Sequence, residues 1–496
     1  MNDVRAVAVD LGAESGRVLV GSLTEGRVVA HEVHRFPNVP VRLPEALYWD
    51  VLRIFGEVRH GLRLAASAGG LASVGVDTWG VDFALLDGKG RLLANPVHYR
   101  DERTARGMDE VARRLAPEEI YATTGIQDMP VNTLNQMAAL VGDPLLEAAE
   151  SMLLMPDLIN YWMCGRQAAE RTFASTTQMY DASKREWAWP VIDGMGFPRR
   201  LFQELVDPGQ SLGPVTPDLL AGTGLDVAAI DNVTVASHDT ASAVVAVPAD
   251  DENIAYISSG TWSLVGVELD APVITEETRE MNFTNEEGFG ATTRFLKNVM
   301  GLWLLQECRR TWEERGERHT YDELVAQAEL APPFERLVDP DDNRFLPPGD
   351  MPARINGFLE ETDQPPATDA GEVVRCVLES LALKYRVVLD RAEHLSGRSI
   401  ERIHIVGGGA RNRVLNQMVA DATDRPVVAG PTEATGLGNL LVQMYAAGRV
   451  SSLEEMRTVA RASTEVTTAV PAADRGGWES AARRFMYLLP RRPRLN

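Results

Sequence analysis

The N-terminal part of the chain alternates between short apolar runs and Gly-containing turns. The runs 5–10, 17–22 and 27–36 predict three short strands that form an antiparallel meander. Apolar positions at helical spacing over 51–66 predict a helix, and the run 72–77 predicts a buried strand that ends at a carboxylate. The predicted order of elements is therefore β-β-β-α-β.

A similar order appears in the second half of the chain. Two strands are predicted at 253–258 and 262–269 around the turn 259–261, and a long helix over 371–395 precedes a strand at 402–406. The two halves share little sequence identity, so the repeat rests on the order of elements and the matching places of the turns. We expect an α/β fold with duplicated βββαβα cores around a central cleft.

Two long segments lack a simple pattern. Residues 99–233 indicate a mostly helical region with many turns, which we interpret as an elaboration of the first core that shapes a substrate pocket. Residues 332–366 are rich in Pro, Asp and Gly, so we expect irregular surface structure there, within the second domain.

Composition narrows the possible classes of protein. A chain of 496 residues with 45% hydrophobic content exceeds what one core usually supports, so two large domains are expected. The net charge of −22 is spread along the chain, which disfavours a nucleic-acid or membrane partner. The three cysteines lie far apart in apolar stretches, and no signal-like or membrane-spanning run is visible, so we expect a cytoplasmic protein.

Two Gly-containing turns are candidates for phosphate binding. In Asp-Leu-Gly-Ala-Glu-Ser-Gly-Arg at 10–17, the backbone could approach an anion while Asp10 holds a hydrated metal ion. The turn Ser-Ser-Gly-Thr at 258–261 lies at the matching place in the second half. Either turn alone could be an ordinary hairpin, but two such turns at matching places in the two halves favour phosphate binding.

Asp239 is the candidate general base. The run 232–236 predicts a strand, and Ser237-His238-Asp239-Thr240 leads from it into a helix. A carboxylate at a helix N-terminus is often only a cap. The functional alternative is that Asp239 orients an attacking hydroxyl group and accepts its proton during phosphoryl transfer.

Three weaker features complete the list of candidates. The glycines at 407–409 join a strand to a helix and could pass close to a nucleotide, or could simply form a tight turn. The segment 78–82 places an aromatic residue and carboxylates at the end of a central strand, where ligands often bind. Asn298 and Gln306 are polar positions among large apolar ones, on what we predict to be one helix. The P-loop pattern is absent.

These motifs together resemble the FGGY carbohydrate kinases. The resemblance rests on Asp10-x-Gly12 with Arg17 and on the segments 78–83, 237–242 and 258–263, and it continues through 296–306, 404–409 and 429–434. It covers nearly the whole chain. His238 stands where most of the family has Gly, and this histidine resembles the subfamily that acts on L-rhamnulose.

The resemblance implies a fold, a reaction and a set of residues. The fold would be a two-domain actin-like ATPase (ribonuclease H-like) fold with domains at 1–245 and 246–458 and an extension at 459–496. The reaction would transfer the γ-phosphoryl group of ATP, with Mg²⁺, to the 1-hydroxyl group of L-rhamnulose. Asp239 would be the base and Asp10 the metal ligand. The residues implied to contact the nucleotide are Ala13, Glu14, Ser15, Gly16, Arg17, Thr261, Gln306, Gly408 and Gly409, and those implied to contact the sugar are Gly80, His238, Asp239, Thr240 and Asn298.

Some departures and alternatives remain. Ala13 replaces the hydroxyl residue that is usual in the phosphate turn, and Glu14 adds a negative charge there. The alternative functions are a kinase for a related substrate such as L-fuculose or L-xylulose, an actin-like ATPase without a sugar substrate, and a sugar-sensing pseudo-kinase. We expect a monomer or a homodimer whose partners are the sugar and ATP.

Overall fold

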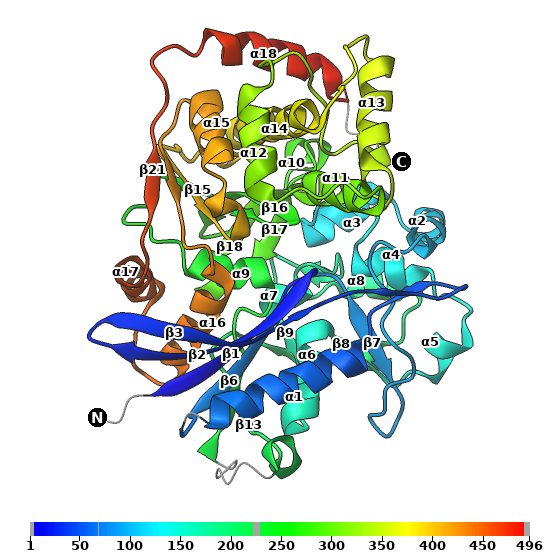
Figure 1. The fold of residues 1–496 in the computed structure, drawn as a ribbon. Coiled ribbons are helices and arrows are strands. Elements are labelled where there is room, and N and C mark those ends of the chain that lie inside the picture. The colour runs from blue at the N-terminus through cyan, green and yellow to red at the C-terminus, as the bar shows by residue number, and fades with distance from the viewer. Residues whose placement is uncertain (1–3, 68, 222–228, 491–496) are drawn as a thin grey trace.

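The computed structural model describes residues 4–67, 69–221 and 229–490 (Figure 1). One sheet has the strand order β13-β14-β6-β1-β2-β3. Its strands are β1 (Arg5–Leu11), β2 (Ser15–Thr24), β3 (Arg27–Pro37), β6 (Ser73–Thr78), β13 (Ser211–Pro214) and β14 (Asp231–Val233). The central strands β1 and β6 are parallel and almost fully buried, which explains their continuous apolar sequence.

A second sheet has the order β17-β18-β16-β15-β19-β20-β21. Its strands are β15 (Ile254–Ser259), β16 (Trp262–Leu269), β17 (Thr284–Glu287), β18 (Thr293–Met300), β19 (Arg402–Val406), β20 (Val427–Ala429) and β21 (Thr467–Ala469). In both sheets an antiparallel meander (β1-β2-β3 or β15-β16-β18) continues into two parallel strands (β6-β14 or β19-β20). The predicted duplication of the core is therefore confirmed.

The helices follow the same duplication. Helix α1 (Val51–Ser67) packs on the first sheet after its meander, and α14 (Ala370–Ser396) packs on the second sheet at the matching place. The remaining helices are α2 (Arg103–Arg114), α3 (Pro117–Thr124), α4 (Thr133–Ala138), α5 (Pro144–Ala148), α6 (Met155–Cys164), α7 (Arg171–Ala174), α8 (Trp189–Met195), α9 (Asp239–Val245), α10 (Glu276–Glu280), α11 (Trp303–Glu314), α12 (Tyr321–Leu330), α13 (Met351–Glu361), α15 (Arg413–Thr423), α16 (Ala434–Ala446), α17 (Leu453–Ser463) and α18 (Gly476–Leu488). Short strand pairs accompany them: β4 (Val41–Arg42) with β5 (Leu47–Tyr48), β7 (Phe83–Leu86) with β8 (Ser151–Leu154), β9 (Ala169–Glu170) with β12 (Leu205–Val206), and β10 (Tyr180–Asp181) with β11 (Glu186–Trp187). Among the described residues, no helix has the length and apolar content needed to span a membrane.

Helix α16 joins the two halves. Although it belongs to the second half of the chain, it packs on the first sheet and on α9 (Figure 1). The Asn439 side-chain amide donates to Oδ2 of Asp77 at 2.6 Å, and the Gln443 amide donates to the carbonyl oxygen of Val7 at 2.9 Å. The first core is therefore completed by a late segment of the chain. The limits 1–245, 246–458 and 459–496 remain a prediction, and 491–496 lie outside the described residues.

Two local predictions were wrong. The segment 332–366 is not surface structure throughout, because it contains α13 and buries Leu337 and Phe345 completely in the second core. Asn298 and Gln306 do not share a helix either, because Asn298 lies in strand β18 and Gln306 in helix α11. Seven of the eight residues of β18 are buried, so the run lacks the alternation that usually identifies a strand.

Candidate active site

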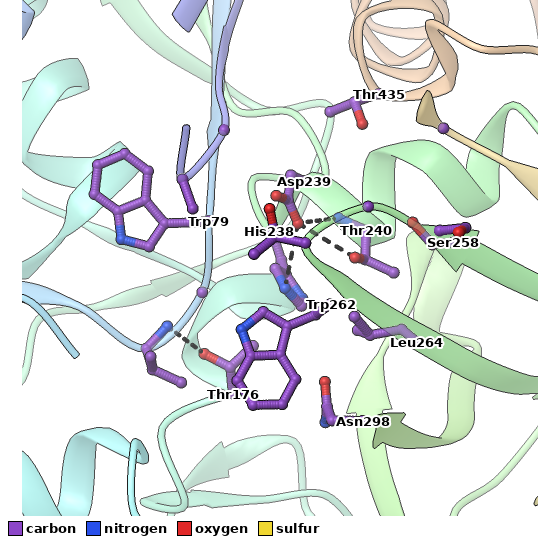
Figure 2. Close-up of a pocket in the computed structure, with 18 of the residues that line it drawn as sticks. Trp79, Thr176, His238, Asp239, Thr240, Ser258, Trp262, Leu264, Asn298 and Thr435 are labelled. Atoms are coloured by element: carbon purple, nitrogen blue, oxygen red, sulfur yellow. Dashed lines mark hydrogen bonds and ion pairs between the residues drawn. The ribbon is translucent and has the colours of Figure 1, made fainter. Parts of the chain in front are cut away.

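A cavity of ≈ 300 Å³ lies between the two sheets (Figure 2). The predicted site residues that line it are Asp10, Ala13, Glu14, Ser15, Arg17, Gly80, His238, Asp239, Thr240, Thr261, Asn298, Gln306 and Gly408. They come from both halves of the chain, and both Gly-containing turns contribute to the wall. The cavity therefore brings the predicted phosphate, sugar and base residues into one site.

Two predicted nucleotide residues, Gly16 and Gly409, lie behind this wall. A Cβ atom on Gly16 would come within 2.2 Å of the Phe36 ring, and one on Gly409 within 2.0 Å of Oγ of Ser259. These glycines let the two turns pack closely against their neighbours. Gly408, by contrast, has open space around its Cβ position and faces the cavity.

The first turn is fixed by hydrogen bonds along its backbone. The amide of Gly12 donates to the carbonyl oxygen of Ser15 at 3.0 Å, which closes the hairpin between β1 and β2. Asn38 clamps the turn twice, because its backbone amide donates to the Glu14 carbonyl at 2.8 Å and its side-chain amide donates to the Gly12 carbonyl at 3.0 Å. The conformation of the loop is therefore supported by contacts within the protein.

Asp10 lies at the end of β1, next to Arg17. Nε of Arg17 is 3.3 Å from Oδ2 of Asp10, and the same guanidinium forms an ion pair with Glu433 at the start of α16. Burial raises the pKa of Asp10 to about 6, with Arg17 opposing the shift and the nearby Asp239 adding to it. Sequence reasoning did not assign a role to Glu433, which also lines the cavity.

The carboxyl group of Asp77 lies close to those of Asp10 and Asp239. Its pKa is well above the ordinary value because the group is completely buried and Asp10 is nearby. Oδ1 of Asp77 and Oδ2 of Asp10 are buried without a hydrogen bond. Among the described residues, no group of three or more His, Cys, Asp or Glu side chains is arranged as a metal site. The carboxylate of Asp10 lines the cavity and nevertheless fits Mg²⁺, which usually keeps several waters and takes only one or two protein carboxylates.

Asp239 occupies the first turn of α9, but His238 is the residue at the cap position. No side chain caps this helix, so Asp239 does not act as its N-cap. Oδ1 of Asp239 accepts hydrogen bonds from the backbone amide of Thr240 at 2.6 Å and from its hydroxyl group at 3.2 Å. Nε2 of His238 lies 3.5 Å from the same oxygen. Desolvation raises the pKa of Asp239, and His238 and Thr240 oppose the shift.

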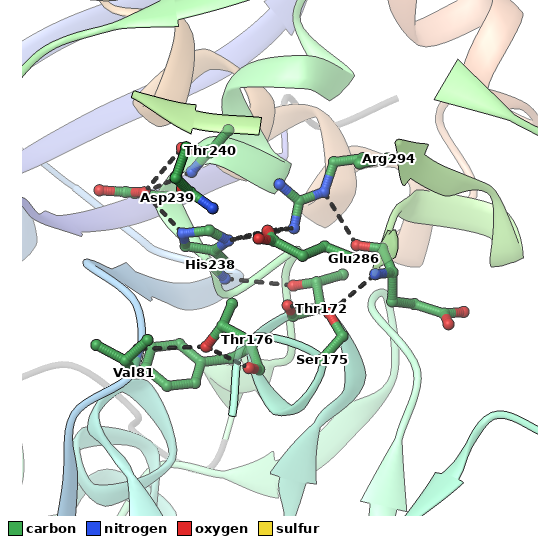
Figure 3. A network of polar contacts seen from close by, with 12 residues as sticks. Val81, Thr172, Ser175, Thr176, His238, Asp239, Thr240, Glu286 and Arg294 are labelled. Carbon is green, nitrogen blue, oxygen red and sulfur yellow. Dashed lines mark hydrogen bonds and ion pairs between the residues drawn. The ribbon is translucent and has the colours of Figure 1, made fainter. Parts of the chain in front are cut away.

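The imidazole of His238 contacts an ion pair that the sequence did not reveal (Figure 3). Nδ1 of His238 lies 3.3 Å from Oε2 of Glu286 and 3.1 Å from Nη2 of Arg294, and these two residues are 3.0 Å apart. Glu286 belongs to β17 and Arg294 to β18, whereas His238 precedes α9. The second sheet therefore holds the histidine that stands beside the candidate base.

The segment around α7 holds the turn at 237–240 from the other side (Figure 3). The amide of Ser237 donates to the Glu170 carboxylate at 3.0 Å, and the amide of His238 donates to the Thr172 hydroxyl at 3.2 Å. Thr176 accepts a hydrogen bond of 3.2 Å from the amide of Val81, next to the predicted sugar residue Gly80. One short segment thus positions both loops.

The carboxylate of the 78–82 motif supports the site without entering it. Asp82 accepts hydrogen bonds from the indole N–H groups of Trp79 at 2.9 Å and Trp49 at 2.5 Å, and from the Gln136 amide at 3.0 Å. Burial raises its pKa to about 6, against the effect of these donors. Asp82 is completely buried, so it holds Trp79 at the cavity wall.

Asn298 and Gln306 face the cavity from the second half of the chain. Gln127 accepts a hydrogen bond of 3.2 Å from the Asn298 side chain, and it too lines the cavity. Gln306 reaches across the cavity to Glu14.

The fold and this site define a class of protein. The model of the N-terminal domain of the FGGY family of carbohydrate kinases matches residues 5–246, and the model of its C-terminal domain matches residues 255–447. The chain belongs to this family and is an ATP-dependent sugar kinase. The predicted two-domain α/β fold of the actin-like type is confirmed.

The chain is also similar to individual known proteins. The chain is 44% identical over 477 residues to a rhamnulokinase of Bacteroides thetaiotaomicron. This match covers 96% of this chain and 97% of the relative. A rhamnulokinase of Bacillus subtilis is 38% identical, and this match covers 94% of this chain and 95% of the relative. Among solved structures, a gluconate kinase from Lactobacillus acidophilus has a TM-score of 0.79 at 15% identity, covering 98% of this chain and 97% of that one. A Plasmodium falciparum glycerol kinase with ADP has a TM-score of 0.75 at 14% identity, with 98% of both chains covered.

Proposed function

We propose that the protein transfers the γ-phosphoryl group of ATP to the 1-hydroxyl group of L-rhamnulose and releases L-rhamnulose 1-phosphate and ADP. The placement of Asp239 carries the proposal: this carboxylate lies beside His238 at the wall of a cavity that both Gly-containing turns also line. The substrate is inferred from the rhamnulokinases that match almost the whole chain at 38–44% identity. An ATP-consuming step of sugar breakdown is expected in the cytoplasm.

Asp239 is suited to orient the attacking hydroxyl group. Its Oδ1 is occupied by Thr240, so the other carboxylate oxygen is left to accept a hydrogen bond from the sugar. The transition state of phosphoryl transfer is loose, so the base mainly aligns the nucleophile and takes its proton late in the reaction. A raised pKa makes the carboxylate a stronger proton acceptor.

The nucleotide would lie along the two turns. Backbone and side-chain groups of 13–17 and Thr261 would contact the phosphates from opposite sides, and Gln306 and Gly408 would meet the rest of the nucleotide. Gly16 and Gly409 would support these contacts from behind. Asp10 would hold Mg²⁺ through its carboxylate, and the bound ion would neutralise charge on the phosphates.

The test is ADP release by the purified protein with Mg²⁺ and ATP. The panel contains L-rhamnulose, L-fuculose, L-xylulose, D-xylulose and glycerol, together with a blank without sugar. Turnover that is highest by a wide margin for L-rhamnulose supports the proposal. A preference for another member of the panel would replace the substrate and keep the reaction, whereas equal turnover in the blank would contradict sugar phosphorylation.

A further inference from the structure

Glu286 is a buried carboxylate in the wall of the cavity. It lies on β17 and is 3% exposed, and its Oε2 lies 3.0 Å from Nη2 of Arg294 and 3.3 Å from Nδ1 of His238. Burial disfavours its charge, but Arg294, His238 and Asn298 together more than compensate, so the pKa of Glu286 is below the ordinary value. The carboxylate of Glu286 therefore lines the cavity in its ionised form.

Glu286 lies beside residues that are expected to bind the sugar, not beside those expected to bind the nucleotide. It contacts His238, and the side chain of Asn298 also favours its ionised form, so it stands between two of the residues expected to bind the sugar. A negative charge at this place would repel a phosphate group but would accept a hydrogen bond from a hydroxyl group.

We propose that Glu286 accepts a hydrogen bond from a secondary hydroxyl group of the ketose and thereby helps to determine which ketose is bound. This inference rests on the proposed function. Glu286 and Asp239 come from different halves of the chain, so a sugar bound to both would join the two sheets across the cavity. A pocket that hydrogen-bonds a hydroxyl group rejects analogues without it, because its buried acceptor is then left unpaired.

The next residue in the strand supplies a matched control. Glu287 is also a buried glutamate of β17, but it does not line the cavity. Its carboxylate accepts hydrogen bonds from the Tyr180 hydroxyl group at 2.9 Å and from Nε of Arg185 at 2.7 Å. Glu287→Gln therefore removes a buried charge from the same strand and leaves the cavity wall unchanged.

The experiment compares wild type, Glu286→Gln and Glu287→Gln by steady-state kinetics and calorimetric sugar binding. Loss of a charge-assisted hydrogen bond should raise the KM and Kd for L-rhamnulose by about 10- to 100-fold in Glu286→Gln. The KM for ATP should stay within about twofold. Glu287→Gln should lower the Tm without raising the KM for the sugar. Glu286→Asp withdraws the carboxylate but keeps its charge near Arg294, so it replaces the Gln variant if that one does not fold.

Deoxy analogues of the sugar distinguish a direct contact between Glu286 and the sugar from a role of Glu286 in holding His238. The analogues of L-rhamnulose that lack the 3- or the 4-hydroxyl group are compared on each variant. If Glu286 binds one of these groups, wild type should discriminate against that analogue and the Glu286 variant should lose the discrimination. An equal penalty on both analogues and on the parent sugar would overturn the inference and leave Glu286 as a support of His238. Absence of turnover of L-rhamnulose by wild type would instead overturn the proposed function, and this inference with it.

Discussion

The side-chain amide of Gln306 donates a hydrogen bond of 3.2 Å to Oε2 of Glu14. This contact crosses the cavity, because Glu14 belongs to the turn between β1 and β2 and Gln306 to α11 of the second half. The acidic side chain of the phosphate turn is thus engaged from the opposite wall, at the place where nucleotide phosphates are proposed to bind.

Removal of the Glu14 charge should strengthen ATP binding. Glu14→Gln keeps a partner for Gln306 but removes a negative charge near the phosphates. Two such charges in a solvated site repel by about 1 kcal/mol, so the KM for ATP should fall by about fivefold. The measurement is the KM at low and high salt, and the gain should shrink as salt increases. Glu313→Gln, at an exposed position of α11, controls for net charge. A raised KM for ATP would show that the Glu14 carboxylate itself is needed for binding.

Replacement of Asp239 by Asn should separate binding from turnover. The Asn side chain retains the shape of the carboxylate but is a poor proton acceptor, so kcat should fall by about 10²- to 10⁴-fold while both substrates still bind. Single-turnover assays and calorimetry check the two parts. Asp350 is a true helix cap, because its side chain accepts a hydrogen bond from the amide of Ala353. Asp350→Ala should therefore lower stability by about 1 kcal/mol and preserve kcat. Wild-type turnover in Asp239→Asn would remove Asp239 from the mechanism.

Gly408 and Gly409 should respond differently to the same substitution. A Cβ atom on Gly409 would collide with Oγ of Ser259, so Gly409→Ala should destabilise the protein by about 1–3 kcal/mol. Gly408→Ala meets open space and should keep the wild-type Tm, but its methyl group enters the cavity and should raise the KM for ATP. Thermal unfolding and ATP kinetics on both variants check this. Adding Ser259→Gly to Gly409→Ala should restore part of the lost stability, and no recovery would locate the strain elsewhere.

Much of the fold could be predicted because its core elements have clear periodic patterns. Helix α1 was expected at 51–66 and begins and ends within one residue of those limits. Helix α14 was similarly predicted from a long apolar periodicity. The hairpin of β17 and β18 was missed, because β18 is buried on both faces and a continuous apolar run does not distinguish a strand from a helix.

The chemistry of the site could be predicted only in part from the sequence, for a related reason. Asp239 lies in a local motif that can be interpreted from neighbouring residues. Glu286 and Arg294 are charged residues in strands that belong to no local motif, and their meaning depends on His238, which lies 56 residues before Arg294 in the sequence. Only the pairing of β17 with β18 places Glu286 directly opposite Arg294. Contacts of this kind arise from the tertiary fold and leave no local pattern.

His404 should make the protein sensitive to acid. It lies opposite Tyr256 in the pairing of β15 with β19, is 2% exposed, and neither ring nitrogen has a hydrogen bond. Burial lowers its pKa to about 4, with Arg402 adding to the effect, from the ordinary value of 6.5. Between these two values the unfolded chain binds a proton that the folded protein does not, so the free energy of unfolding falls as the pH decreases through this window.

His404→Leu should flatten this part of the stability profile. The histidine contributes a slope of at most about 1.4 kcal/mol per pH unit, and leucine removes it while it keeps the position apolar. Denaturant unfolding at several pH values between 4.5 and 7 measures the effect, with His31→Leu at an exposed position of β3 as the control. The His404 variant should gain stability relative to wild type as the pH decreases, whereas the control should follow wild type. Parallel profiles for all three proteins would assign the acid sensitivity to other groups, because a histidine that stays neutral only when folded must produce this difference.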